Sequence, residues 1–258
     1  MTKPPFMVFT DLDGTLLDHE SYSYAAALPA LAQLRARNVP VVLASSKTGP
    51  EIHALREELR LSASPAIVEN GAGLLMPREA PPEQGETYLR LRAALDRIDP
   101  DLRRCFRGFG DLGPEGVVED AGLPYEKARL ACQRAYSEPG LWDGDAEQKR
   151  AFLTALTDHG ITARRGGRYL TLSFGGTKAD RMDEAAALFD NPPRIALGDA
   201  PNDREMLEHA DIGVIIANPH GAPLPELSGE REGAILRSQK IGPAGWNEMM
   251  LKLTSRLS

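Results

Sequence analysis

Two aspartates separated by a single residue are the first candidate chemical groups in the chain. They belong to the run DLDGT at residues 11–15, which follows an apolar stretch. In an extended chain, side chains two residues apart point to the same side, so the carboxylates of Asp11 and Asp13 share one side. Gly14 lets the backbone turn back and present N–H groups to an anion. Such a pair can form an aspartyl phosphate with one carboxylate and transfer protons with the other.

A simple turn or a calcium-binding loop would use similar residues. The calcium loop needs further ligands and a late glutamate, and Thr15 stands here at its third ligand position. A buried strand before the motif is typical of a catalytic strand end. We therefore interpret Asp11 and Asp13 as reactive groups.

A second acidic motif, GDAPND at residues 198–203, follows another apolar run. By itself this pattern is equally typical of an Asx turn that caps a helix. Beside the first motif, Asp199 becomes the natural further ligand of a metal ion, and Asp203 would act behind it or through a water molecule. We expect Asn202 to help bind the phosphate.

A lysine at the start of a helix is the candidate for neutralising charge. Lys178 follows Gly-Gly-Thr at residues 175–177. A helix N-terminus is already positive, so a lysine there is mildly unfavourable unless an anion lies nearby. We expect Lys178 to neutralise Asp11 and the phosphoryl oxygens, a solvated lysine being the alternative. Ser45, or Ser46 after it, can donate a hydrogen bond to a phosphoryl oxygen or simply cap the next helix.

Five apolar runs, each ending in polar or acidic turn residues, must position these groups. Continuous runs of this kind are typical of strands buried on both faces, as in a parallel sheet. The runs are Phe6–Phe9, Val39–Ala44, Ala66–Val68, Ile195–Leu197 and Ile212–Ala217. Helical patterns lie between them. The expected fold class is therefore α/β, with a doubly wound, Rossmann-like parallel sheet.

The polar residues at the strand ends should converge on one pocket, because an open α/β sheet binds ligands at the carboxyl ends of its strands. Those ends carry Asp11, Ser45, Glu69, Asn70, Asp199 and Asn218. Carboxylates gathered at one point repel one another unless a cation joins them, and ligands that are all oxygen favour a hard cation. Mg²⁺ fits because it shares a substrate phosphate while keeping water ligands. The pattern predicts metal-assisted phosphoryl transfer, with Glu69 and Asn70 among the substrate-binding residues.

The middle of the chain has a different pattern. It is mostly helical, with one hairpin whose expected arms are Ile161–Arg164 and Arg168–Phe174, around a turn at residues 165–167. Residues 77–85 are typical of a linker, and Gly175-Gly176 of a return hinge.

These boundaries predict two domains. Residues 1–77 and 175–258 would form the core, and residues 78–174 would form an inserted domain.

Composition and charge exclude several classes of function. The chain has 258 residues and a formal net charge of −7. It lacks the basic footprint of a nucleic-acid-binding protein, and an anionic membrane surface would repel it. No run approaches the roughly 18 apolar residues of a membrane span, and the N-terminus has no signal-peptide pattern. Two cysteines without a C-x-x-C pair and five histidines without paired spacing favour neither a disulfide framework nor a zinc site. We expect a cytoplasmic protein.

The four motifs, in this order, resemble those of the haloacid dehalogenase superfamily of aspartate-nucleophile phosphatases. They are the DLDGT run at 11–15, Ser45, Lys178 and the GDAPND run at 198–203. The resemblance implies that Asp11 is the nucleophile and that Asp13 is the acid and base. It also implies that Mg²⁺ is bound by the carboxylates of Asp11 and Asp199 and by the backbone carbonyl of Asp13. The inserted domain resembles the larger α/β cap, of type C2B, of the Cof-like branch.

Shorter strings within that branch resemble the mannosyl-3-phosphoglycerate phosphatase family. They are ASSKT at 44–48, ENGA at 69–72, RAYSEP at 134–139 and GGRY at 166–169. The resemblance implies hydrolysis of mannosyl-3-phosphoglycerate to phosphate and mannosylglycerate, a compatible solute.

Such a substrate carries a carboxylate and a sugar besides its phosphate. Arg164, Arg165 and Arg168 are candidates for the carboxylate, since a guanidinium can bind it bidentately, although an exposed basic turn is the simpler interpretation of any one of them. Ser137 and Glu138 could meet sugar hydroxyls.

Three other functions remain open. A broader sugar-phosphate phosphatase and a phosphomannomutase-like phosphotransferase would use the same aspartates. A sugar-phosphate sensor would have lost a catalytic residue, and none is missing. The expected partner is in each case a small phosphorylated sugar or glycerate, with no nucleic acid and no membrane, and the protein would be a monomer or a homodimer.

Overall fold

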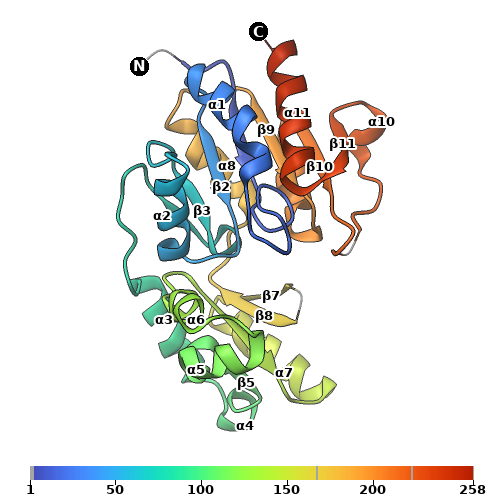
Figure 1. Cartoon of the computed structure of the whole chain (residues 1–258). Helices are drawn as coiled ribbons and strands as arrows, with labels where there is room; N and C mark the ends of the chain where they lie inside the picture. Colours follow the sequence, from blue (N-terminus) through green and yellow to red (C-terminus); the bar gives the residue numbers. More distant parts are fainter. Residues whose placement is uncertain (1–2, 167, 222, 258) are drawn as a thin grey trace. The chain divides into compact units, whose positions relative to one another are not determined.

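The computed structural model describes residues 3–166, 168–221 and 223–257 (Figure 1). The chain divides into two units. The core unit contains residues 1–45, 56–78 and 177–258, and the insert unit contains residues 46–55 and 79–176.

A seven-stranded sheet in the order β11-β10-β9-β1-β2-β3-β4 is the centre of the core unit. Neighbouring strands are parallel except at one edge, where β4 runs antiparallel to β3. The strands are β1 (Met7–Thr10), β2 (Val41–Ala44), β3 (Ala66–Val68), β4 (Gly73–Leu75), β9 (Arg194–Gly198), β10 (Ile212–Ala217) and β11 (Ile235–Ile241). All five expected strands are present, and the predicted α/β class is confirmed. The two edge strands β4 and β11 were not expected.

Helices cover both faces of this sheet. Helices α8 and α9 contact each other and pack against β3, β9 and β10, while α11 contacts α1, β10 and β11. Their bounds, with those of the other helices of the core unit, are α1 (Leu28–Ala36), α8 (Lys178–Ala187), α9 (Arg204–His209), α10 (Ser228–Arg231) and α11 (Gly242–Arg256). Helix α2 (Gly49–Glu58) contains residues of both units. Helix α2 begins with a capping box, since the Thr48 N–H donates to Glu51 Oε2 at 2.8 Å.

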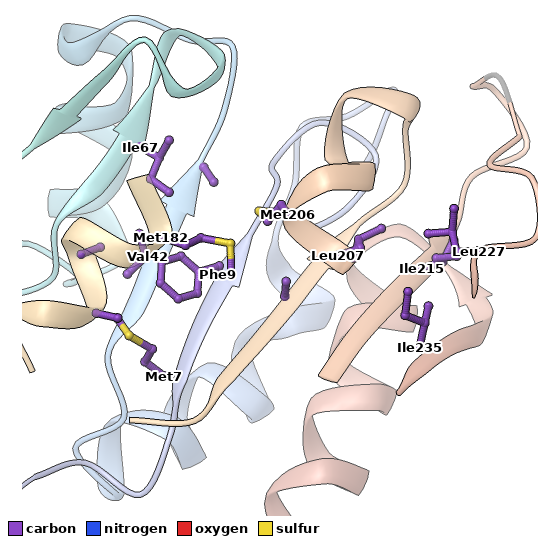
Figure 2. Close-up of a cluster of buried hydrophobic side chains, with 14 of the residues drawn as sticks. Met7, Phe9, Val42, Ile67, Met182, Met206, Leu207, Ile215, Leu227 and Ile235 are labelled. Atoms are coloured by element: carbon purple, nitrogen blue, oxygen red, sulfur yellow. The ribbon is translucent and has the colours of Figure 1, made fainter. Parts of the chain in front are cut away.

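Side-chain alternation along β1 divides the core into two layers. Met7 and Phe9 belong to a buried cluster with Met182 of α8 and Met206 of α9 (Figure 2). Their neighbours in the strand point to the opposite face, because successive side chains alternate. Thr10 accordingly meets Trp246 of α11 there, with the indole Nε1 3.0 Å from its hydroxyl. Burial on both faces explains why these strands read as continuous apolar runs.

The insert unit contains a four-stranded antiparallel sheet in the order β5-β6-β8-β7. Leu170 and Leu172 of β8 pack in a cluster with Phe106 and Phe152. The strands are β5 (Phe106–Gly108), β6 (Ser137–Trp142), β7 (Thr162–Gly166) and β8 (Tyr169–Ser173). The helices are α3 (Glu86–Leu95), α4 (Pro100–Arg103), α5 (Phe109–Ala121), α6 (Tyr125–Cys132) and α7 (Ala146–Asp158).

This sheet differs from the single hairpin that the sequence predicted. The hairpin is present, but β7 continues through Arg165 and Gly166, which were expected to form the turn. The turn residue Gly167 lies outside the described residues. Strands β5 and β6 were not predicted, because β5 has only three residues and β6 carries Pro139 and Gly140, which disfavour strands.

Among the described residues, no helix has the length and apolarity needed to cross a membrane.

Candidate active site

Three aspartates at the ends of neighbouring strands form a buried acidic cluster. Asp11 follows β1 and Asp199 follows β9, and the Asp11 N–H donates to the Leu197 carbonyl between these strands at 2.9 Å. Asp203 ends the 3₁₀ turn Pro201–Asp203. One carboxylate oxygen from each aspartate lies within 4.8 Å of the other two, and all three residues are buried. These three carboxylates therefore converge at the carboxyl ends of the strands, as expected for a parallel sheet.

A buried lysine lies against this cluster. Lys178 is the first residue of α8, which the Thr177 hydroxyl caps by accepting from the N–H of Asp180 at 3.1 Å. Its Nζ donates to Asp11 Oδ1 at 2.7 Å and to Asp203 Oδ1 at 2.6 Å, and the side chain is 2% exposed. The carboxylates thus supply the anion that makes a lysine favourable at a helix N-terminus.

Backbone donors hold Asp203 in place. Its Oδ2 accepts from the N–H groups of Asp199 and Ala200, each at 3.1 Å. A Cβ at Gly198 would lie 2.5 Å from the Asp203 Cβ, so the close approach requires glycine. Asp203 therefore accepts hydrogen bonds both from the backbone at Asp199 and from Lys178.

Two neutral donors orient Asp199. The Thr15 hydroxyl donates to Oδ1 at 2.6 Å, and the Asn218 amide donates to Oδ2 at 2.7 Å. Gly14 has φ +85°, and a Cβ there would lie 2.5 Å from Asn218 Nδ2. The sequence placed Asn218 at a strand end and Thr15 in the first motif but indicated no role for either. The available signal was the position of Asn218 directly after β10 and that of Thr15 in the same motif as Asp11 and Asp13.

Burial shifts the titration of these groups. It raises the pKa of Asp11 well above its usual range, and the charge of Asp203 raises it further. It also raises the pKa of Asp199, although hydrogen bonds to this carboxylate act in the opposite direction. Burial alone would lower the pKa of Lys178, but the charges of Asp11 and Asp203 raise it, so the amine is an ammonium. When all are ionised, three carboxylates and one ammonium leave a surplus of two negative charges.

This donor set fits a divalent cation. The ligand atoms offered are all carboxylate oxygens, which a hard cation such as Mg²⁺ prefers, and the surplus charge equals the charge of one such ion. Uncompensated, the same carboxylates would repel one another in a buried site.

Asp13 lies in the turn after the first aspartate. The N–H groups of Thr15 and Leu17 both donate to the Leu12 carbonyl, at 3.1 and 2.8 Å, and close this turn. Asp13 is half-buried. Within the described ranges, the cluster of potential metal-binding carboxylates does not include that of Asp13.

A left-handed turn after β3 supports the start of α8. Glu69, Asn70 and Gly71 have φ values of 53°, 57° and 90°. A Cβ at Gly71 would lie 2.1 Å from the Thr177 carbonyl carbon, so the turn and the helix start are in close contact. Arg181 of α8 donates through Nε to the Gly71 carbonyl at 3.1 Å. This turn therefore braces the backbone from which Lys178 projects.

The remaining predicted phosphate-binding residues of the core unit are Ser45, Glu69, Asn70 and Asn202, which lie at or near its strand ends. The buried Ser45 accepts through its carbonyl from the Asn70 N–H at 2.9 Å. Asn202 donates through its amide to Asn70 Oδ1 at 3.4 Å. Glu69 is 2% exposed. Ser46 belongs to the insert unit.

The three arginines predicted to bind a carboxylate all belong to the insert unit. Arg168 donates to the backbone carbonyl of Asp120, lies 3.4 Å from its carboxylate and stacks over the Tyr169 ring. Arg164 and Arg165 are exposed on β7.

Two nearby polar residues have partners inside the insert unit. Ser137 is fully buried and accepts from Arg134 at 2.7 Å, and Glu138 is fully buried against Arg92 at 2.8 Å. Their expected contact with sugar hydroxyls stays a prediction.

Comparison with known proteins identifies the class of protein that this fold and cluster define. The model of the haloacid dehalogenase-like hydrolase family matches residues 8–81. A solved sugar phosphatase of subclass IIB of this superfamily has the same fold, with a TM-score of 0.61 at 16% identity, covering 97% of this chain and 98% of the other. Together with the relatives described next, these findings show that the chain belongs to the haloacid dehalogenase-like hydrolases.

Two full-length relatives narrow the class to phosphatases. Both are glucosyl-3-phosphoglycerate/mannosyl-3-phosphoglycerate phosphatases. The one from Methanococcoides burtonii is 32% identical to this chain, and the alignment covers 97% of this chain and 97% of the relative. The one from Persephonella marina is 30% identical over 97% of this chain and 98% of the relative. The chain is accordingly a phosphoric monoester hydrolase of this family, as its motifs predicted.

Proposed function

We propose that this phosphatase forms an aspartyl phosphate on Asp11, requires Mg²⁺, and hydrolyses mannosyl-3-phosphoglycerate to phosphate and mannosylglycerate. The observation that carries the chemistry is the buried cluster of Asp11, Asp199 and Asp203 with Lys178. The names of the two full-length relatives support the substrate.

The first half of the reaction transfers the phosphoryl group to Asp11. Lys178 occupies Oδ1 of this carboxylate, and Oδ2 accepts no hydrogen bond from the described residues. Oδ2 therefore attacks phosphorus, and the bond from phosphorus to the glycerate oxygen breaks. Asp13 gives its proton to the leaving oxygen.

The second half returns the enzyme to its starting state. Asp13, now ionised, takes a proton from a water molecule that attacks the phosphorus of the aspartyl phosphate. The acyl phosphate bond breaks, which releases inorganic phosphate and restores the Asp11 carboxylate and the protonated Asp13. Lys178 holds positive charge beside the phosphoryl group throughout.

The carboxylates of Asp11 and Asp199 and the backbone carbonyl of Asp13 would hold Mg²⁺, with Asp203 behind them. When bound, this ion supplies positive charge to the phosphoryl oxygens. We further propose that Ser45, Ser46, Glu69, Asn70 and Asn202 contribute to binding the substrate.

The insert unit would act as the cap that recognises the rest of the substrate. The substrate has a carboxylate that the core lysine does not neutralise, so the cap needs a cation. Arg164, Arg165 and Arg168 are the candidates for this role, since a guanidinium can bind a carboxylate bidentately.

Phosphate release from a panel of monoesters tests the proposal. The panel contains mannosyl-3-phosphoglycerate, glucosyl-3-phosphoglycerate, 3-phosphoglycerate, mannose 6-phosphate and p-nitrophenyl phosphate. The two glycosyl phosphoglycerates should have the highest kcat/KM. Equal kcat/KM for mannose 6-phosphate would show a broader sugar phosphatase instead, and phosphoryl return to a sugar would show a mutase.

A further inference from the structure

A chain of two buried hydrogen bonds connects helix α11 to the backbone of Asp11. The Trp246 indole Nε1 donates to the Thr10 hydroxyl at 3.0 Å, and this hydroxyl donates to the Asp11 carbonyl at 2.8 Å. Trp246 and Thr10 are both 0% exposed. No water reaches these groups, so each bond has to be made within the protein.

The Asp11 carbonyl belongs to the peptide group that also contains the Leu12 N–H. The described residues contain no cis peptide bond, and in a trans peptide the C=O and N–H point in opposite directions. The Thr10 hydroxyl therefore sets the direction of the Leu12 N–H by holding the carbonyl on its other side. In the part of the chain that the structure describes, this N–H donates to no backbone oxygen.

The two polar groups stand out on this face of the sheet. Val8 of β1 and Leu43 of β2 point to the same face of the sheet as Thr10, and both are apolar and fully buried. Valine would fill the volume of Thr10 without a hydroxyl, and phenylalanine would replace most of Trp246 without a donor. Packing alone explains neither the hydroxyl nor the indole N–H.

We propose that Thr10 and Trp246 are positioning residues that lock the Asp11–Leu12 peptide so that its N–H is aimed at a phosphoryl oxygen during transfer. This inference rests on the proposed function of Asp11. A backbone donor fixed before the reaction stabilises developing charge without reorganising, and a small misplacement of such a donor is costly. The residues act through the backbone and touch no substrate.

The test compares Thr10→Val, which removes the hydroxyl, with Thr10→Ser, which keeps it. With p-nitrophenyl phosphate and saturating Mg²⁺, Thr10→Val should lower kcat roughly 10- to 100-fold with KM changed less than about threefold. Thr10→Ser should retain kcat within about threefold of wild type. Orthovanadate, which mimics the phosphoryl transition state, should lose affinity for Thr10→Val by a factor similar to the loss in kcat.

Two further variants separate the relay from general damage to the core. Thr254→Val removes another buried hydroxyl of α11, one that donates to the Met250 carbonyl at 2.6 Å, and should leave kcat within about twofold. Trp246→Phe removes only the first donor and should lower kcat and vanadate affinity by roughly 3- to 10-fold. If Thr10→Val does not fold, Trp246→Phe decides in its place.

A measurement without substrate distinguishes failure of the relay from failure of the proposed function. The Trp246 indole proton should exchange slowly with deuterated solvent in wild type and in Thr10→Ser, and faster in Thr10→Val. Rapid exchange in wild type, or a folded Thr10→Val with wild-type kcat and vanadate affinity, would overturn the relay. A wild-type protein that hydrolyses no phosphate monoester would instead overturn the proposed function.

Discussion

Replacing Lys178 with methionine removes the one ammonium from the buried cluster and keeps most of the side-chain volume. The ammonium lies 2.7 Å from Asp11 and 2.6 Å from Asp203, and the lysine side chain is 2% exposed. At an effective dielectric constant of about 20, opposite unit charges at this separation attract by roughly 6 kcal/mol. The cost of burying the ions offsets much of this attraction, and truncating one partner of a buried pair destabilises proteins by about 3–5 kcal/mol. We expect Lys178→Met to lower the free energy of unfolding at pH 7 by that amount.

Urea denaturation in the presence of EDTA measures this loss, with the fluorescence of the buried Trp246 as the signal. Lys252→Met, at an exposed position of α11, is the matched control and should change stability by less than about 0.5 kcal/mol. Added Mg²⁺ should restore part of the stability of Lys178→Met, because the ion replaces some of the missing positive charge and binds only the folded state.

A loss below about 1 kcal/mol for Lys178→Met would refute the electrostatic reasoning, since it would mean that the carboxylates tolerate one another without the lysine. Turnover of Lys178→Met within about tenfold of wild type would refute the proposed role of the lysine in phosphoryl transfer.

Gly71→Ala should destabilise the protein by at least about 2 kcal/mol and lower kcat, because a Cβ would lie 2.1 Å from the Thr177 carbonyl carbon and shift the start of α8. The control is Gly122→Ala, where φ is +69° and nothing lies within 4 Å of the added Cβ. In the same urea titrations this variant should lose only about 1 kcal/mol, and its kcat should be unchanged. Burial alone would raise the pKa of Asp111, but hydrogen bonds from two arginines and a backbone N–H lower it. The stabilisation by the ionised Asp111 carboxylate is therefore present above the unfolded-state pKa of about 4 and is lost as the pH falls through the lower folded-state pKa. The difference in the free energy of unfolding between wild type and Asp111→Asn should accordingly shrink from pH 7 to pH 3. A constant difference would contradict this reasoning. Activity should vanish in EDTA and return with Mg²⁺ but poorly with Ca²⁺, which prefers a looser coordination; phosphate release after exhaustive chelation would contradict the metal requirement.

The strand ends could be predicted from the sequence because their signals are local. A parallel strand buried on both faces is a continuous apolar run, and the residue after it lies at the edge where ligands bind. Asp11 and Asp199 follow two such runs and do meet in the structure. The position of Lys178 followed from a local conflict of charge at a helix start, and the ion pairs to Asp11 and Asp203 resolve that conflict.

Strands with weaker sequence patterns could not be predicted. The edge strands β4 and β11 need neither length nor a continuous apolar run, and β11 contains Arg237, Gln239 and Lys240. Charged residues are common on edge strands because they prevent pairing with other chains. In β6, Pro139 and Gly140 argue against a strand, which forms because it pairs with β8.

Contacts between distant residues that do not lie at the predicted strand ends could not be predicted from the sequence. Thr10 and Trp246 are 236 positions apart, and their hydrogen bond arises only when α11 packs on the sheet. The pairing of Arg168 with Asp120 is likewise a product of the insert-unit fold.

Detecting a phosphoryl group on Asp11 during turnover tests the account most directly. The protein is mixed with mannosyl-3-phosphoglycerate and Mg²⁺, quenched in acid within milliseconds to seconds, digested, and analysed by mass spectrometry for modified aspartate. The account predicts a phosphorylated peptide that carries the modification on Asp11, that accumulates in Asp13→Asn, and that is absent from Asp11→Asn, which should also release no phosphate. Sustained phosphate release by Asp11→Asn, or a phosphoryl group on another residue, would contradict it.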